Sequence, residues 1–198
     1  MELACEGAEA LGVSVTEQQL IAYLMDAHAI EEQSRGLVRR ARRAGERDEL
    51  REIYADHLAR TEEHRQLLQA RLQAHGAKPS AVKDAAMRLG ALNWSLIFQA
   101  QMVAPGKATA LVFALTHVKI ASYELLNRVA ARAADEATVA MTERVLAGER
   151  AGAARLSASF DQALDASLED WDTSRSAAGA LRRTQAIGEA MRVPLGSV

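Results

Sequence analysis

The sequence predicts an all-α protein, a four-helix bundle with one long connection. Aromatic residues make up only 4% of the 198 residues, and three prolines occur, so the composition favours helices. Apolar residues recur at helical spacing along most of the chain, and no alternating pattern typical of a strand lasts more than a few residues. The long periodic segments end at glycine, proline or a capping residue, which predicts where each helix stops.

The first two predicted helices form a hairpin. One covers about residues 16–44, with Thr16 as its N-cap and Gly45 after its end, and the next covers about residues 47–75 and ends at Gly76. Because few residues separate them, the two helices are expected to be antiparallel neighbours. The end of the first helix contains five arginines, which suit the helix dipole: Arg35, Arg39, Arg40, Arg42 and Arg43.

The second half repeats this arrangement after a crossover. A shorter apolar helix is predicted over residues 80–103, followed by long helices over residues 107–134 and 135–168, the last opened by Asp135. Two long hairpins flanking a short crossover helix form the ferritin-like arrangement. We therefore predict a ferritin-like bundle domain over residues 1–168 and a C-terminal helical tail over residues 169–198, with a weaker helix at about 174–191.

Charge and composition exclude several classes of protein. The net charge of −2 predicts no strong attraction to nucleic acid or to a membrane, and the single cysteine, Cys5, excludes an intrachain disulfide and a cysteine-rich metal site. The N-terminal residues lack the features of a signal peptide, and the most apolar run falls short of the ~20 residues of a membrane span. These observations predict a cytoplasmic protein. The arginine run is interpreted as a solvated helix end, with contact to nucleic acid as the alternative.

Each long helix has an apolar stripe that contains an ionisable residue. The stripe over 16–44 is Leu20, Leu24, Ala27, Glu31, Ser34, Val38 and Ala41. The stripe over 47–75 is Leu50, Tyr54, His57, Thr61, His64, Leu68 and Leu72, with Arg60 at its edge. The stripe over 107–134 is Leu115, Ser122, Leu126 and Val129, with Lys119 at its edge. The stripe over 135–168 is Val139, Leu146, Glu149, Ala153, Ser157, Phe160 and Leu164.

The ionisable residues share one level in the predicted bundle. Glu31 lies 14 residues before Gly45 and Arg60 lies 15 after it. Lys119 lies 16 residues before Asp135 and Glu149 lies 14 after it. At ~1.5 Å per residue, all four lie about 20 Å from their turns. Because buried charges are costly unless paired, this arrangement predicts a functional or paired polar centre.

These residues and their neighbours resemble the bacterial stress-induced, ferritin-like proteins of the YciF type. The resemblance covers about residues 20–164 and lies in the strings MDAHAIEEQS, YADHLARTEEHRQLL, FALTHVKIASYELLNRVA and VLAGERAGAARLSASFDQAL. It implies a stress-associated role and a two-metal centre held by carboxylates from all four helices. By this resemblance, the retained ligands are Glu31, His57 and Glu149.

The chain departs from the family pattern where further carboxylates are expected. Ala59 and Arg60 stand in place of two glutamates in the second long helix, and Thr116 and Lys119 in place of two in the third. Two divalent ions need about four carboxylates, whereas here two carboxylates face two cations. An ammonium group ~4 Å from an incoming ion repels it by ~4 kcal/mol at an effective dielectric of ~20.

We therefore predict a degenerate site without a cofactor, in which Arg60 and Lys119 replace the ions, and a non-catalytic structural or interaction role. The alternative is a carboxylate–histidine site for iron or manganese that acts on iron, peroxide or oxygen, with the ligands Glu31, His57, Glu149 and His64. A small-molecule binder is a third possibility, which no particular residue supports. We expect a homodimer, for which the apolar residues 92–102 offer either an interface or a lid on the bundle.

Simpler roles remain for several of these residues. Lys119 either pairs with Glu31 or Glu149 or extends its ammonium group to solvent. His57 and His64 each fit the role of a hydrogen-bonded core histidine, with Tyr54 or Thr61 as the partner of His57. The other three histidines are expected to be exposed: His28, His75 and His117.

Overall fold

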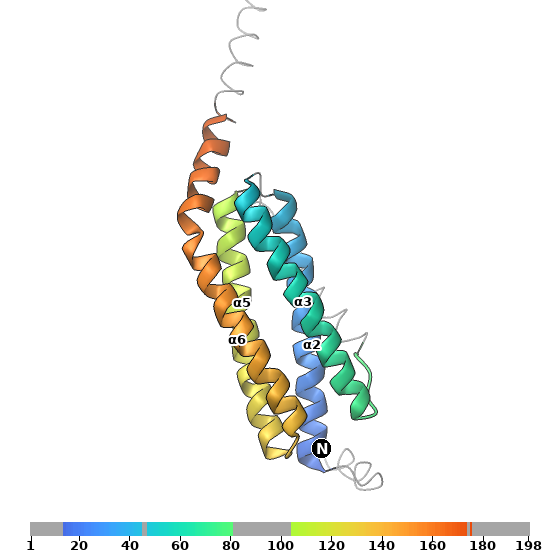
Figure 1. The fold of residues 1–198 in the computed structure, drawn as a ribbon. Helices are drawn as coiled ribbons and strands as arrows, with labels where there is room; N and C mark the ends of the chain where they lie inside the picture. The colour runs from blue at the N-terminus through green and yellow to red at the C-terminus, as the bar shows by residue number, and fades with distance from the viewer. Residues whose placement is uncertain (1–13, 45–46, 81–103, 174, 176–198) are drawn as a thin grey trace, which may run out of the picture.

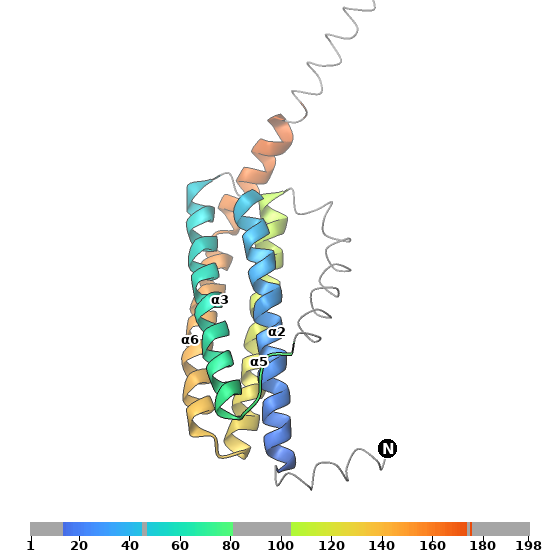
Figure 2. The ribbon, with the colours of Figure 1, turned by 90° about the vertical axis from the view of Figure 1, so that its right-hand side faces the viewer.

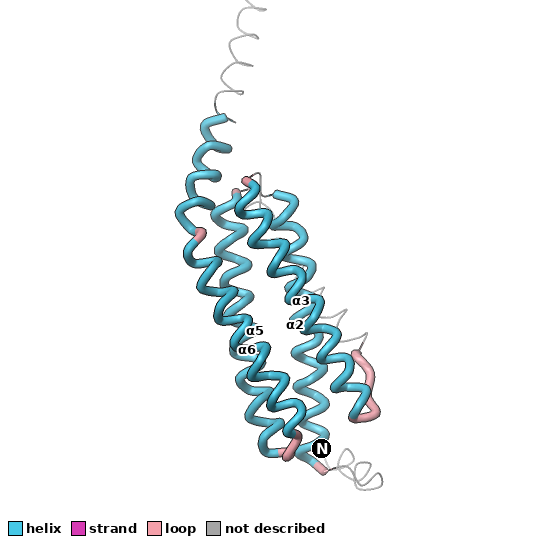
Figure 3. The backbone as a smooth tube through the Cα atoms, in the orientation of Figure 1, coloured by secondary structure: helices cyan, strands magenta, loops and turns pink. Residues whose placement is uncertain are grey.

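The computed structural model describes residues 14–44, 47–80, 104–173 and 175. Four long helices form the bundle: α2 (Val15–Ala44), α3 (Asp48–Ala74), α5 (Pro105–Arg132) and α6 (Glu136–Ala158) (Figure 1). The pairs α2/α3 and α5/α6 form hairpins, and α2 also packs closely against α5, whereas α3 and α6 contact each other much less (Figures 1 and 2). Figure 3 shows that a short loop joins α5 to α6. The predicted all-α bundle is confirmed.

Parts of the sequence-based prediction lie outside the described residues. These parts are the crossover helix over 80–103 except its first residue, the apolar residues 92–102 within it, and nearly all of the C-terminal helix over 174–191. The proposed domain boundary after residue 168 stays a prediction. By length and composition, α5 is the one helix among the described residues that could span a membrane, a test that the core helix of a bundle also passes.

The helix ends follow from capping residues. At α2 the cap is Ser14 rather than Thr16, because the Glu17 backbone N–H donates to Ser14 Oγ at 3.1 Å. Asp135 caps α6 as predicted and accepts a hydrogen bond from the backbone N–H of Thr138 at 3.1 Å. After α3, Gly76 adopts a φ of 65°, a left-handed conformation that glycine adopts without strain.

Burial confirms the predicted stripes of α2 and α3 and corrects the other two. Every residue of the first two stripes is buried. On α5 the buried face is shifted by about one residue, so Lys119 lies at its centre, between Thr116 and Tyr123. On α6 the prediction is wrong at Ser157 and Leu164, which are exposed. The buried face lies about one residue earlier, at Leu156, Ser159, Ala163 and Ala166, and keeps its helical spacing past the interruption at Ser159.

Two apolar layers enclose a polar layer along the bundle axis. One layer joins the start of α2, the end of α3, the second half of α5 and the start of α6, with Leu24, Leu68 and Leu126 among its members. The other layer contains Val38, Leu50, Val112 and Leu156, among others. The polar residues lie between these layers on every helix. On α3, for example, His57, Thr61 and His64 separate Tyr54 of one layer from Leu68 of the other. The fold therefore holds the polar centre away from both ends of the bundle.

Candidate functional site

Each helix of the bundle contributes an ionisable side chain to a cluster in the polar layer. Glu31 comes from α2, His64 from α3, Lys119 from α5 and Glu149 from α6. All four are buried, and Lys119 and both glutamates have no exposed surface. We call these four side chains the central ion-pair network.

The Lys119 ammonium group lies between the two carboxylates. Its Nζ donates to Glu149 Oε1 at 2.6 Å and lies 2.9 Å from Glu31 Oε2, the second contact being an ion pair without hydrogen-bond alignment. The alternative in which Lys119 extends to solvent is therefore wrong. With all three groups desolvated, one cation bridges two anions that would otherwise repel each other at close range.

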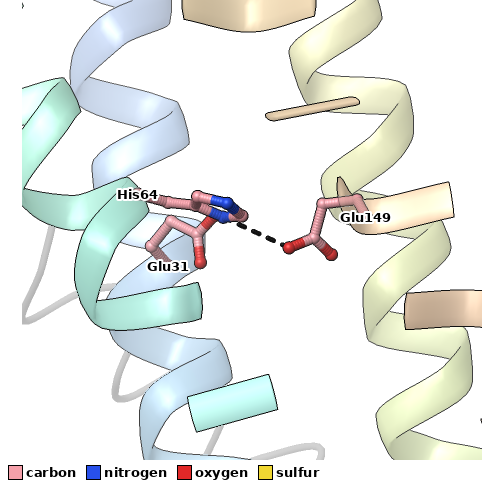
Figure 4. Close-up of side chains that lie close together, drawn as sticks. All are labelled: Glu31, His64 and Glu149. Carbon is pink, nitrogen blue, oxygen red and sulfur yellow. Dashed lines mark hydrogen bonds and ion pairs between the residues drawn. The ribbon is translucent and has the colours of Figure 1, made fainter. Parts of the chain in front are cut away.

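His64 completes the bridge from the side of α3. Its Nδ1 lies 3.2 Å from Glu31 Oε1 and 3.2 Å from Glu149 Oε1. Figure 4 shows the imidazole beside Glu31, with its contact to Glu149 directed across the bundle. Burial lowers the pKa of His64, but hydrogen bonding to Glu149 and Glu31 outweighs this effect and raises the pKa above its usual value. The two carboxylates therefore stabilise the protonated imidazole relative to a free histidine.

The same contacts keep Glu149 ionised. Burial by itself raises the pKa of this carboxyl group, yet the hydrogen bond from His64 and the charge of Lys119 lower it to about 2. The two carboxylates of the centre, Glu31 and Glu149, are thus matched by two basic groups, the Lys119 amine and the His64 imidazole.

Tyr123 is a member of the site that the sequence analysis missed. Its hydroxyl group donates to Glu31 Oε1 at 2.8 Å, and its ring packs edge-on against His64 with centroids 6.0 Å apart. Burial and the neighbouring charge of Glu31 raise the pKa of Tyr123 well above its usual value, so the hydroxyl stays a donor. The sequence did contain a signal for this role, because Tyr123 lies one helical turn after Lys119 and therefore on the same face of the helix.

His57 lies about two turns along α3 from His64 and forms no ion pair or hydrogen bond with the two carboxylates. Its Nε2 is 3.5 Å from Thr116 Oγ1 and its Nδ1 is 3.4 Å from Arg60 Nη2. Tyr54, a partner suggested by the sequence, instead forms a 2.7 Å hydrogen bond with Thr109. Burial and the charge of Lys119 lower the pKa of His57 to about 3, so this histidine is neutral.

Arg60 lies at the seam between α3 and α6, half-buried, and forms no ion pair with Glu31 or Glu149. Its side chain lies beside two glycines of α6, and a Cβ atom on Gly152 would be only 2.8 Å from Arg60 Nη2. Lys119 is therefore the central cation, and Arg60 acts on Glu149 only at longer range.

Four buried polar atoms in this region have no hydrogen-bond partner among the described residues. Three belong to side chains of the polar layer, Glu31 Oε2, Thr61 Oγ1 and Glu149 Oε2, and the fourth is Arg60 Nε. Thr61 lies on the buried stripe of α3, between His57 and His64.

The remaining histidines lie outside the network. His28 is buried, contrary to expectation, because α2 packs against both α3 and α5 and so buries positions beside its main stripe. His75 is also less exposed than expected: it is partly buried, and its Nε2 lies 2.9 Å from Oδ2 of Asp135, the N-cap of α6. His117 is exposed, as expected.

Comparison with known proteins places the chain in a family. The family model described as "Domain of unknown function (DUF892)" matches residues 15–169. The chain belongs to this family. No curated protein matches the chain.

Two crystal structures share the fold. A protein from Xanthomonas campestris pv. campestris is 21% identical, with a TM-score of 0.67 over 80% of this chain and 99% of that one. The E. coli stress protein YciF is 18% identical, with a TM-score of 0.66 over 77% of this chain and 98% of that one. The resemblance to proteins of the YciF type, stated above from the sequence, is thereby confirmed.

The donor set does not fit a two-metal centre. Glu31, His64 and Glu149 offer ligand atoms within 4.8 Å of one another, enough to form part of a site for one ion. A second ion has no further carboxylate in the described polar layer, where Thr61, Thr116 and Lys119 occupy the neighbouring positions. The Lys119 ammonium group also contacts both carboxylates that an ion would need.

Proposed function

We propose that the protein is a non-catalytic member of this family in which a fixed ion-pair network replaces metal ions. The observation that carries the proposal is the position of Lys119 Nζ, 2.9 Å from Glu31 and 2.6 Å from Glu149. The network gives the bundle a neutral centre without a metal, and the protein then acts through its surface as a structural or interaction protein.

Electrostatics explain why such a centre disfavours metal. A divalent ion approaching to ~4 Å of the ammonium group is repelled by ~4 kcal/mol per unit charge at an effective dielectric of ~20. For each unit of charge on the ion, this repulsion weakens metal binding about a thousandfold, since ~1.4 kcal/mol is a factor of ten. The raised pKa of His64 acts in the same direction, because a protonated imidazole is not a ligand.

A structural relative supports a proposal about the biological setting. YciF of E. coli is named a stress protein, and we propose a stress-associated role for this chain also. We further propose a cytoplasmic homodimer that binds neither membranes nor nucleic acid, in keeping with the net charge of −2.

Elemental analysis tests the proposal. The protein purified without chelators is expected to contain far less than one equivalent of iron or manganese per chain. The double variant Lys119→Glu with Arg60→Glu is expected to gain metal binding, seen as a rise in melting temperature with added Mn²⁺. Lys107→Glu, an exposed position on the same helix, is the matched control and should show no such rise. Two tightly bound ions per chain in the parent protein would overturn the proposal.

A second function is favoured by one specific observation, the close approach of Glu31, His64 and Glu149. These residues would hold a single iron or manganese ion if Lys119 moved away, and bound iron would supply redox chemistry toward peroxide or oxygen. His57, which the sequence also suggested, lies outside this set. Saturation at one equivalent of metal in the parent protein, lost in His64→Gln, would support this function over the first.

A further inference from the structure

A strongly acidic helical segment extends past one end of the bundle. Residues 160–173 are helical and run beyond the ends of α2 and α3, in orange to red in Figures 1 and 2. We call them the acidic segment, because no lysine or arginine lies between Arg155 and Arg175, whereas five acids do: Asp161, Asp165, Glu169, Asp170 and Asp172.

The acidic segment also exposes large apolar side chains on one face. Leu164, Leu168 and Trp171 are 55%, 51% and 64% exposed. Their spacing of four and then three residues places them on the same side of the helix. Half of the exposed large apolar side chains in the described part of the chain lie here, since the others are Val15, Val118 and Leu125. A contiguous apolar face of this kind marks a surface for association.

A basic surface lies at the same end of the bundle. Four exposed arginines in the last turns of α2 form what we call the arginine end: Arg39, Arg40, Arg42 and Arg43. None of the four has an acidic partner within ion-pair distance in the described residues. Arg47, just before α3, pairs with Glu169 of the acidic segment at 2.5 Å, which shows that both surfaces belong to this end.

We propose that these two surfaces form the interface of a homodimer, with the acidic segment of each copy against the arginine end of the other. Because both surfaces lie at one end of the molecule, a twofold axis makes the contact reciprocal and closes the assembly at two copies. Two acidic segments meeting alone would repel each other, and the arginines of each partner offset this repulsion. The exposed face of Leu164, Leu168 and Trp171 then becomes buried near the axis.

This proposal names the surface of the homodimer suggested above but does not depend on the state of the bundle centre. The acidic segment and the arginine end lie outside the central ion-pair network. A metal-containing parent protein would therefore overturn the proposed function and leave the interface unaffected.

Charge reversal in the full-length protein tests the interface. Light scattering after size exclusion and sedimentation equilibrium measure the dimer dissociation constant. Arg39→Glu with Arg42→Glu is expected to raise this constant at least tenfold, and adding Asp161→Arg and Asp165→Arg should restore it. Arg144→Glu, an exposed arginine on α6 away from this end, is the control and should change it little. All substituted side chains are exposed, and circular dichroism checks that each variant keeps its helices.

Two results would overturn the proposal. One is a protein that stays monomeric at all accessible concentrations. The other is a dimer whose dissociation constant is unchanged by both the arginine reversal and Trp171→Ala, since the contact then uses another surface. The interface is also expected to weaken as salt rises from ~0.1 to ~1 M, because the Debye length falls from ~10 Å to ~3 Å.

Discussion

The Lys119 ammonium group lies 2.6 Å from Glu149 Oε1, and neither side chain has any exposed surface. This contact joins α5 to α6, and the additional contact to Glu31 joins both to α2. The ion pair is enclosed by apolar layers on both sides along the bundle axis. A buried charge in such a place is tolerated only while its partners remain, so the three side chains act as one unit.

Lys119→Met tests this dependence, because methionine keeps the unbranched stem of the side chain and removes its ammonium group. The two buried carboxylates then face each other with only His64 between them. We expect a loss of about 3–5 kcal/mol in the free energy of unfolding, measured by urea denaturation. Lys107→Met, on the exposed face of the same helix, is the control and should change stability by less than about 0.5 kcal/mol. A loss of similar size in both variants would contradict the ion-pair interpretation.

Two buried tyrosines offer a matched pair of hydrogen bonds. Tyr123 donates to the carboxylate of Glu31 at 2.8 Å, whereas Tyr54 shares a 2.7 Å hydrogen bond with the neutral hydroxyl of Thr109. Hydrogen bonds to charged groups contribute about 1.5–3 kcal/mol and neutral ones about 1 kcal/mol. We therefore expect Tyr123→Phe to lower the free energy of unfolding more than Tyr54→Phe. The opposite order would show that the network does not depend on the tyrosine.

The first hairpin was predictable because each of its stripes has a regular spacing. On α2 and α3 apolar residues recur on both sides of the polar positions, so the phase of each helix is well determined and every stripe residue is buried. On α5 many small and moderately polar residues suit either the buried or the exposed face, so they do not determine the phase of the helix. The sequence therefore placed Lys119 at the edge of the buried face and missed Tyr123.

The rest of the site depends on distances between side chains of different helices, which the periodicity of a single helix does not determine. His57 and His64 lie on the same stripe, and only the structure shows that His64 contacts both carboxylates. Arg60 falls at the predicted level, yet its side chain lies beside Gly152 instead of reaching the glutamates. The break at Ser159 was missed because nothing in the local sequence, neither proline nor glycine, marks it.

Thr61 and Thr109 provide a comparison between an unpaired and a paired buried hydroxyl group. Thr61 Oγ1 has no partner among the described residues, whereas Thr109 Oγ1 contacts both Tyr54 and the Pro105 carbonyl group. Valine has nearly the same shape as threonine, so Thr61→Val should leave stability unchanged or raise it. Thr109→Val should cost about 1–3 kcal/mol, because it leaves the Tyr54 hydroxyl group unpaired. A loss of that size for Thr61→Val would instead indicate an ordered water bound at Thr61.

The two histidines of α3 should make opposite contributions to the pH dependence of stability. The pKa of His57 is lowered to about 3, against ~6.5 in an unfolded chain, so the unfolded state binds one more proton between these values. The stabilisation from neutral His57 is complete above pH ~6.5 and is lost as the pH falls. The pKa of His64 is raised, so its contribution is complete below pH ~6.5 and is lost as the pH rises through its folded value.

Urea denaturation between pH ~6 and ~5 separates these contributions. His57→Gln removes the proton that the unfolded state takes up, so the fall in unfolding free energy on acidification should be shallower than in the parent by up to about 1.4 kcal/mol per pH unit. His64→Gln should instead destabilise the protein most at the acidic end of this range, where the lost imidazolium contacts to Glu31 and Glu149 are fully formed. If His57→Gln kept the slope of the parent protein, His57 would be charged in the folded state, and its place beside Lys119 and Arg60 would need another explanation.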